Sequence, residues 1–298
     1  MASFKAIVLW FPRERLPLVN GLFMSFGGLG ALSATGPVEL ALGITDWRGV
    51  YAVVGFVTAL VAAVILMISP DKPEARSSES VAHQIKGLFE VYRDKLFWRV
   101  APVAIAGAGA GLAIQTLWVG PWLSDVAGLD RDTVAGHLTL VAAAMAAGMA
   151  SMGIVADLAW QKFSIPPRRV FLAGSIIFLL VQLLLIAEFM QISLYLWMLF
   201  GFLSNFSAMA FAILSQHFPT KRSGVANTGM NLFVFAMAFA LQYGIGAVID
   251  SFPVTAAGTY SPEAFQTAFG VVAAIQVAAI TWFLIAPRII GRPEPLVD

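Results

Sequence analysis

Residues 218–227 read "FPTKRSGVAN" and lead into an apolar run that continues to Ile249. An earlier stretch, "FPRERLPLVN" at residues 11–20, shares its Phe-Pro pair, an Arg four positions after the Phe and an Asn nine positions after it. It also leads into a long apolar run. A turn proline and a basic anchor before such a run are typical of a chain that enters a membrane helix. The repeat therefore indicates either a chance match or an internal duplication of membrane segments.

The composition excludes an ordinary soluble domain. Hydrophobic residues make up 59% of the 298 residues and charged residues only 12%, whereas soluble domains average about 45–50% and about 25%. Because a bilayer core is spanned by about 20 apolar residues in a helix, we counted apolar runs of that length. The sequence predicts an all-α membrane protein, a polytopic bundle whose eight transmembrane helices are Leu16–Gly43, Val50–Ser69, Val100–Leu123, Gly136–Ala156, Val170–Ala187, Leu194–Gln216, Gly224–Ile249 and Ala264–Ala286.

The distribution of basic residues predicts the orientation of these helices. Lys and Arg accumulate on the cytoplasmic side of a membrane protein. With eight helices, only Arg48 and Arg131 lie on one side. The other sixteen lie on the opposite side: Lys5, Arg13, Arg15, Lys72, Arg76, Lys86, Arg93, Lys95, Arg99, Lys162, Arg168, Arg169, Lys221, Arg222, Arg288 and Arg292. We therefore expect a multi-pass protein of the cell (inner or plasma) membrane with both termini in the cytoplasm.

One long polar connection divides the chain. Residues 70–99 begin as a Ser/Glu/Lys/Pro-rich linker and continue with apolar residues at helical spacing, which predicts an amphipathic helix on the membrane surface. The predicted parts are residues 1–69 with two helices, the cytoplasmic linker 70–99, a six-helix part at 100–288 and a cytoplasmic tail at 289–298.

The duplication implies an unequal pair of halves. Each copy of the repeated stretch is followed by a helix, an outer loop and another helix. Two six-helix halves related by an axis along the membrane normal would explain this pattern. Four helices precede the second copy within its half, but only ten residues precede the first. The sequence thus predicts that eight of twelve helices are present and that the first four are missing from this chain.

Three further stretches carry a resemblance to a known family. "DWRGVYAVVG" (Asp46–Gly55), "GLAIQTLWVGPWLSDVAGL" (Gly111–Leu129) and "GIVADLAWQKFSIPPRR" (Gly153–Arg169) are similar to patterns of the major facilitator superfamily of secondary transporters. The resemblance covers nearly the whole chain, from the end of that family's fourth helix onward. It implies transport of a small solute by alternating access, with the two halves rocking around a site near the midplane, and with a proton or ion as a possible coupling partner.

The third stretch resembles the family's signature loop, with departures. Leu158 stands where an Arg usually follows the Asp, and the basic residues lie further downstream. The resemblance implies that Asp157 latches one conformation by pairing with basic groups, for which Lys162, Arg168 and Arg169 are the candidates. The alternative is a solvated acid at the membrane boundary. The family's antiporter motif is reduced to Gly36 and Pro37, so drug-proton antiport is less expected.

Polar residues inside apolar helices are the candidates for a solute site, because polar groups facing lipid are costly. We predict a substrate-binding role for Gln115, Asn205 and Asn231, which lie at or near mid-depth, and for Trp118, which could stack on a substrate. The alternative for the amides is interhelical hydrogen bonding, worth about 0.6 kcal/mol each. The alternative for Trp118 is the aromatic belt at the membrane interface. The small-residue run "AGAGAGLA" predicts close helix packing.

Other kinds of chemistry have little support in the sequence. The chain has no Cys and three scattered His, so we expect no metal site and no cofactor, and we expect neither an enzyme nor a nucleic-acid partner. Glu39 is the best candidate for a coupling carboxylate, with an ordinary interface acid as the alternative. The lipid bilayer and a small-molecule solute are the expected partners. A shortened membrane protein that acts as a partner or scaffold without transporting remains the competing function, and we expect the 298-residue chain not to transport by itself.

Overall fold

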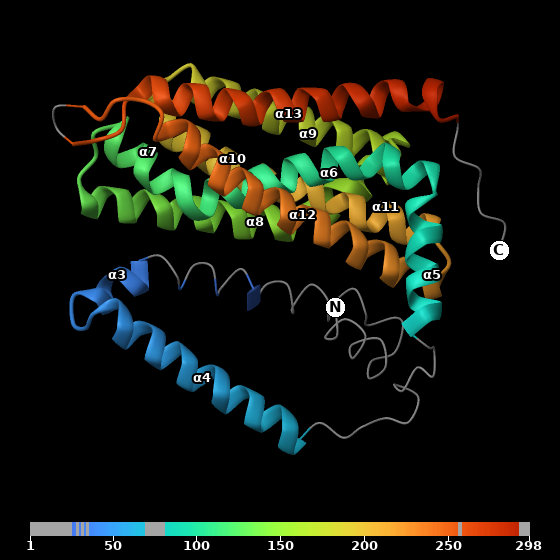
Figure 1. Cartoon of the computed structure of the whole chain (residues 1–298), viewed down its shortest axis with the longest axis horizontal. Coiled ribbons are helices and arrows are strands. Elements are labelled where there is room, and N and C mark those ends of the chain that lie inside the picture. The colour runs from blue at the N-terminus through green and yellow to red at the C-terminus, as the bar shows by residue number, and fades with distance from the viewer. Residues whose placement is uncertain are drawn as a thin grey trace.

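The computed structural model describes residues 26–27, 30, 33, 36–68, 81–255 and 258–291, and every regular element in these ranges is helical. Within these ranges the main bundle is preceded by α3 (Gly36–Leu42), α4 (Trp47–Ile68) and α5 (Val81–Tyr92). The bundle contains α6 (Lys95–Ala113), η3 (Ile114–Trp118), α7 (Val119–Asp125), α8 (Arg131–Phe163), α9 (Pro167–Ile186), η4 (Met190–Ile192), α10 (Ser193–Ser204), η5 (Asn205–Ala208), α11 (Met209–His217), α12 (Thr220–Ile249) and α13 (Pro262–Ile289) (Figure 1).

Seven helical segments of the described residues are long and apolar enough to span a membrane. This is one fewer than the eight predicted. The one not counted is the first, residues 16–43, most of which lies outside the described residues; α3 lies within it. Six of the seven segments follow one another in the bundle: Lys95–Asp125, Arg131–Phe163, Pro167–Ile186, Met190–His217, Arg222–Ile249 and Pro262–Ile289.

Aromatic and aliphatic side chains fill the centre of the bundle. Trp197 and Phe200 of α10 are fully buried, and the Trp197 ring meets Trp122 edge to face at 5.3 Å between centroids. The outer surface is also apolar: Leu180 on α9 is 52% exposed and Phe239 on α12 is 72% exposed. A helix bundle that is apolar both inside and outside is suited to lipid rather than to water.

Helix α4 stands apart from the bundle (Figure 1). No side chain of residues 47–67 is buried, although the segment has a mean hydropathy of 2.6 over its most apolar window. The helix is connected through a short turn to α3, which contacts α8. An apolar helix without buried side chains requires lipid or further protein around it.

The second copy of the repeated stretch forms the turn between α11 and α12 and the first two turns of α12. Phe218 is buried, and Arg222 forms an ion pair with Glu90 of α5 at 2.7 Å. The Asn227 side-chain amide donates to the hydroxyl of Ser215 on α11 at 2.7 Å. The side chains at three of the four positions shared with residues 11–20 are thus buried or paired at this end of α12. The first copy lies outside the described residues.

The start of α6 contacts the end of α11, directly before this turn. The Asp94 carboxylate caps α6 by accepting a hydrogen bond from the Phe97 N–H at 2.9 Å, and its other oxygen lies 3.0 Å from Nε2 of His217. Because capping residues are often charged and stand before the apolar run, the helix begins several residues before the predicted start at Val100. Helix α5 lies across this end of the bundle (Figure 1).

Candidate functional site

Two of the membrane-spanning segments contain an irregular stretch. The segment that begins as α6 changes to a π-helix at η3, and the segment that begins as α10 changes to a 3-10 helix at η5. Gln115 is the second residue of η3 and Asn205 is the first residue of η5. Two of the three predicted site amides therefore lie where the regular helix is interrupted. π-Helical turns inside α-helices occur frequently at functional sites.

These two amides converge on one residue of α8. The Gln115 Nε2 lies 2.9 Å from the Met145 sulfur, and the Asn205 Nδ2 donates to the Met145 carbonyl oxygen at 3.3 Å. Beside Gln115, the hydroxyl of Thr116 accepts a hydrogen bond from the Gln242 Nε2 at 2.9 Å. We call these five residues the amide cluster. They come from four separate membrane-spanning segments.

Small residues allow α6 to lie close to the segments that complete the cluster. A Cβ added to Gly109 would be 3.0 Å from the Met237 Cβ on α12, and one added to Gly111 would be 3.0 Å from the Ser204 Cβ on α10. Neither neighbour leaves room for a larger residue. The close packing predicted from "AGAGAGLA" is present at these two positions.

The other two predicted substrate residues lie outside the cluster. Asn231 is half-buried on α12 and has no hydrogen bond to any part of the chain that the structure describes. It precedes Gln242 by 11 residues, about 16 Å along the same helix face. Trp118 is 8% exposed, packs edge to face against Phe265 of α13 at 6.4 Å and lies beside Gly246 of α12. The indole ring of Trp118 is thus part of the apolar core.

The predicted latch is not assembled in this conformation. Asp157 is exposed near the end of α8, as is Lys162, while Arg168 and Arg169 are exposed in the first turn of α9. Within residues 81–255 no ion pair joins Asp157 to any of these basic groups. The latch remains a prediction.

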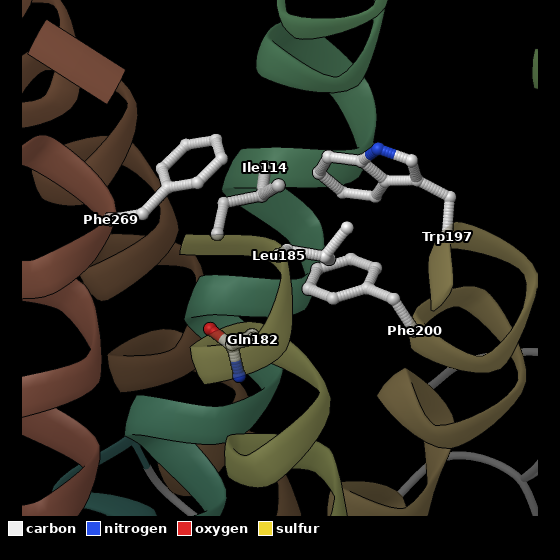
Figure 2. A pocket seen from close by; sticks show the side chains of 6 residues that line it. All are labelled: Ile114, Gln182, Leu185, Trp197, Phe200 and Phe269. Carbon is white, nitrogen blue, oxygen red and sulfur yellow. The ribbon is translucent and has the colours of Figure 1, made fainter. Parts of the chain in front are cut away.

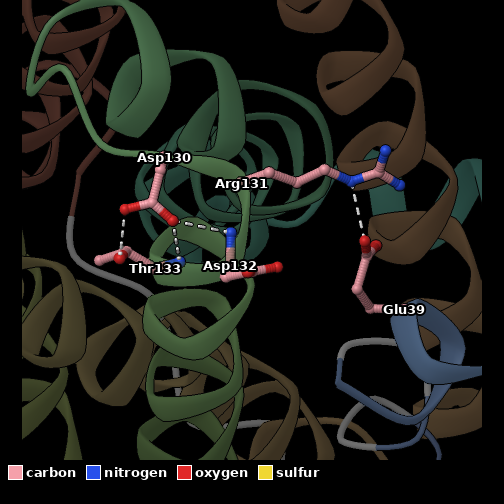
Figure 3. A network of polar contacts seen from close by, with 5 residues as sticks. All are labelled: Glu39, Asp130, Arg131, Asp132 and Thr133. Carbon is pink, nitrogen blue, oxygen red and sulfur yellow. Dashed lines mark hydrogen bonds and ion pairs between the residues drawn. The ribbon is translucent and has the colours of Figure 1, made fainter. Parts of the chain in front are cut away.

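Glu39 lies at the opposite end of α8, in an ion pair (Figure 3). Its Oε1 is 2.8 Å from the Arg131 Nε. The neighbouring Asp130 carboxylate caps α8 by accepting from the Asp132 and Thr133 N–H groups, both at 3.1 Å. The Thr133 hydroxyl, and then its N–H, donate to Asp130 and hold the pKa of that carboxyl below its usual range. The Glu39 carboxylate therefore belongs to a polar network where α8 begins, and its coupling role remains a prediction.

Sequence reasoning missed a second pair of amides. The Gln182 Nε2 donates to the Gln276 Oε1 at 3.0 Å, and the Gln276 Nε2 donates to the Gln182 Oε1 at 2.8 Å. Both side chains are 3% exposed, between α9 and α13. Each is the lone polar residue of an apolar stretch, "FLLVQLLLI" (178–186) and "AAIQVAAI" (273–280). That signal could have drawn attention to them, although it does not say that they meet.

A small hollow lies beside Gln182 (Figure 2). It is lined by Ile114, Gln182, Leu185, Trp197, Phe200 and Phe269, and the space is too small for a water molecule. It is therefore a packing defect of the core and not a solute site. In the described ranges no three His, Asp or Glu side chains are grouped closely enough to hold a metal ion.

Comparison with known families agrees with this architecture. The family description "Major Facilitator Superfamily" matches residues 1–241. This match covers most of the chain, so the chain belongs to that family. It is a multi-pass membrane protein of a transporter family whose members handle small solutes and are generally not enzymes. No curated protein matches the chain.

Proposed function

We propose that this chain takes part in secondary transport of a small solute across the cell (inner or plasma) membrane. In this proposal the six-helix part, Lys95–Ile289, is one half of a carrier that works by alternating access, and both chain ends are cytoplasmic. The amide cluster lines the solute pathway. Glu39 as a proton-coupling group, and Asp157 with its basic neighbours as a latch, are further parts of the proposal.

The main support for the proposal is that Gln115 and Asn205 are hydrogen-bonded less completely than Gln182 and Gln276. Gln182 and Gln276 each donate one hydrogen bond to the other and accept one from it, as expected for groups that only hold helices together. Gln115 instead donates to a thioether, which is a weak acceptor. The side-chain oxygens of Gln115 and Asn205 accept no hydrogen bond from the described residues. Polar atoms with free bonding capacity inside an apolar bundle are explained by contact with water or a solute.

The chemistry of the cluster favours a solute that is bound through hydrogen bonds. Its polar groups are amides and one hydroxyl, with the Met145 thioether between them. None of the five side chains carries a formal charge. We therefore propose that the portion of the solute in contact with this cluster is uncharged and polar.

Thiol reactivity tests whether the cluster is hydrated. The chain has no cysteine, so Gln115→Cys and Asn205→Cys each introduce a single thiol into the 298-residue chain. Reagents of the methanethiosulfonate type react with the thiolate, which forms in water and not in hydrocarbon. We expect both thiols to react at least about tenfold faster than a Leu180→Cys thiol on the exposed apolar surface of α9.

A second control places the thiol between helices. Gln182→Cys lies in the fully paired amide set and is expected to react as slowly as Leu180→Cys. If Gln115→Cys and Asn205→Cys reacted no faster than these two controls, the cluster would be ordinary helix packing and the proposed pathway would be wrong.

A further inference from the structure

Three helices meet around an arginine at the end of the bundle where α6 and α9 begin and α13 ends. The Arg99 guanidinium of α6 lies 4.9 Å above the Phe283 ring of α13, and its Nε donates to the Phe283 carbonyl oxygen at 3.4 Å. The Phe283 ring in turn packs against Phe171 of α9 with 6.0 Å between centroids. Arg99 is therefore held at a junction of all three helices.

Two more cations lie at this junction. Arg168 precedes Phe171 by three residues and so shares its face of α9, and Phe171 packs against the Phe283 ring that lies under Arg99. Lys95 lies one turn before Arg99 on α6, and its Nζ is close to Gly291, just beyond α13. We call Lys95, Arg99 and Arg168 the cation cluster.

No counter-charge for these cations is present in the part of the chain that the structure describes. Its ion pairs are Arg48 with Asp46, Arg131 with Glu39, His217 with Asp94, and Arg222 with Glu90. The two acids nearest to this end of α6 in the sequence, Glu90 and Asp94, are thus already paired elsewhere. Three cations brought together without an acid favour a bound anion.

Two tryptophans indicate the depth of the cluster in the membrane. The Trp282 Nε1 donates to the carbonyl oxygen of Trp98 at 2.7 Å, and these residues directly precede Phe283 and Arg99. Tryptophans are enriched at the level of the lipid headgroups. A phospholipid phosphate lies at this level and can accept the paired N–H groups of a guanidinium.

We propose that the cation cluster binds the phosphate headgroup of an anionic phospholipid. The lipid neutralises the repulsion between Arg99 and Arg168 and ties the end of α9 to α6 and α13. This site is separate from the amide cluster, and Arg168 is the one residue that it shares with the proposed latch.

Thermal unfolding in nanodiscs of defined composition tests this proposal. In phosphatidylcholine discs, we expect added phosphatidylglycerol to raise the Tm of the wild-type chain. Arg168→Gln should need about fivefold more phosphatidylglycerol for half of this shift, because one basic residue near an anionic surface contributes about that factor. In pure phosphatidylcholine the same variant should be no less stable than wild type, since one of the repelling charges is gone.

Arg169→Gln is the matched control, because it removes the same charge from the next position of the same helix turn. It should keep most of the lipid-dependent shift. Arg99→Gln, like Arg168→Gln, should need more phosphatidylglycerol than wild type for half of the shift. Equal shifts in wild type and in both the Arg99 and Arg168 variants would overturn the proposal.

Two further experiments distinguish the lipid from a free anion and from Asp157 as the partner of the cation cluster. Inorganic phosphate added to phosphatidylcholine discs should not reproduce the shift; if it did, the ligand would be a free anion and not a lipid. Asp157→Asn should leave the shift unchanged. A loss in that variant would assign Arg168 to the proposed latch and contradict the lipid site.

Discussion

Replacing Gly148 by alanine is expected to destabilise the folded chain strongly, because the added methyl group meets backbone. Gly148 on α8 faces the backbone of α10, where an added Cβ would overlap the Phe202 carbonyl. Gly201 on α10 faces α8 in the same way, with its added Cβ only 2.7 Å from the Val141 carbonyl oxygen. Since backbone atoms cannot rotate away, the two helices have to separate. Overpacking of this kind costs about 1–3 kcal/mol, and more where the backbone must move.

The measurement is the Tm of the purified chain in detergent, and Gly153→Ala is the matched control. Gly153 lies on the same helix, and an added Cβ there meets nothing within 4 Å. Because alanine favours helix over glycine by up to about 1 kcal/mol, this control should be at least as stable as wild type. A Gly148→Ala chain as stable as the control would mean that α8 and α10 do not approach as described.

Replacing one partner of the buried Gln182 and Gln276 pair is expected to cost about 1–3 kcal/mol, because the other amide is left buried without a partner. Gln182→Leu and Gln276→Leu should therefore each lower the free energy of unfolding. The double variant should recover most of the loss, since two leucines leave no polar group unsatisfied. A double-mutant cycle on unfolding free energies measures this recovery.

The result also bears on the amide cluster. Gln115→Leu should cost less than Gln182→Leu, because Gln115 donates only to a thioether and leaves no strong acceptor unpaired. Strictly additive losses in the double variant would show that Gln182 and Gln276 do not interact. A larger loss for Gln115→Leu than for Gln182→Leu would indicate that the cluster is structural.

The positions of the helices could be predicted from the sequence because the membrane requires long apolar runs. The predicted Gly224–Ile249 and the observed Thr220–Ile249 end at the same residue. The predicted Gly136–Ala156 is shorter than α8, Arg131–Phe163. The helix is longer at both ends because it begins at Arg131, directly after its cap Asp130, and continues past Asp157 and Lys162. A count of apolar residues leaves out these charged positions.

The irregular stretches could not be predicted in the same way. In η3 and η5 the spacing of the backbone hydrogen bonds changes within a membrane-spanning segment. The hydropathy of a segment does not depend on this spacing, so it cannot reveal the change. Gln115 and Asn205 were found as polar residues at mid-depth, but their convergence on Met145 depends on how three segments pack. The ion pair of Glu39 with Arg131 joins residues 92 positions apart and was likewise not foreseen.

Trp118 shows that residue spacing predicts which side chains share a helix face only where the helix is regular. It follows Gln115 by three residues, which would place the two side chains on one face of a regular α-helix. The π-helical turn at Ile114–Trp118 changes that relation, and Trp118 lies in the core against Phe265. Its contact with substrate stays a prediction.

The central claim is that the amide cluster lies on a pathway that opens to both sides of the membrane. The most direct measurement is the sidedness of labelling at Asn205→Cys, with a membrane-impermeant thiol reagent applied to intact cells or to inside-out vesicles. In a carrier that also has its other half, alternating access predicts that this thiol is modified from either side, because the site faces each side in turn. Modification from neither side, or from one side alone, would contradict the account.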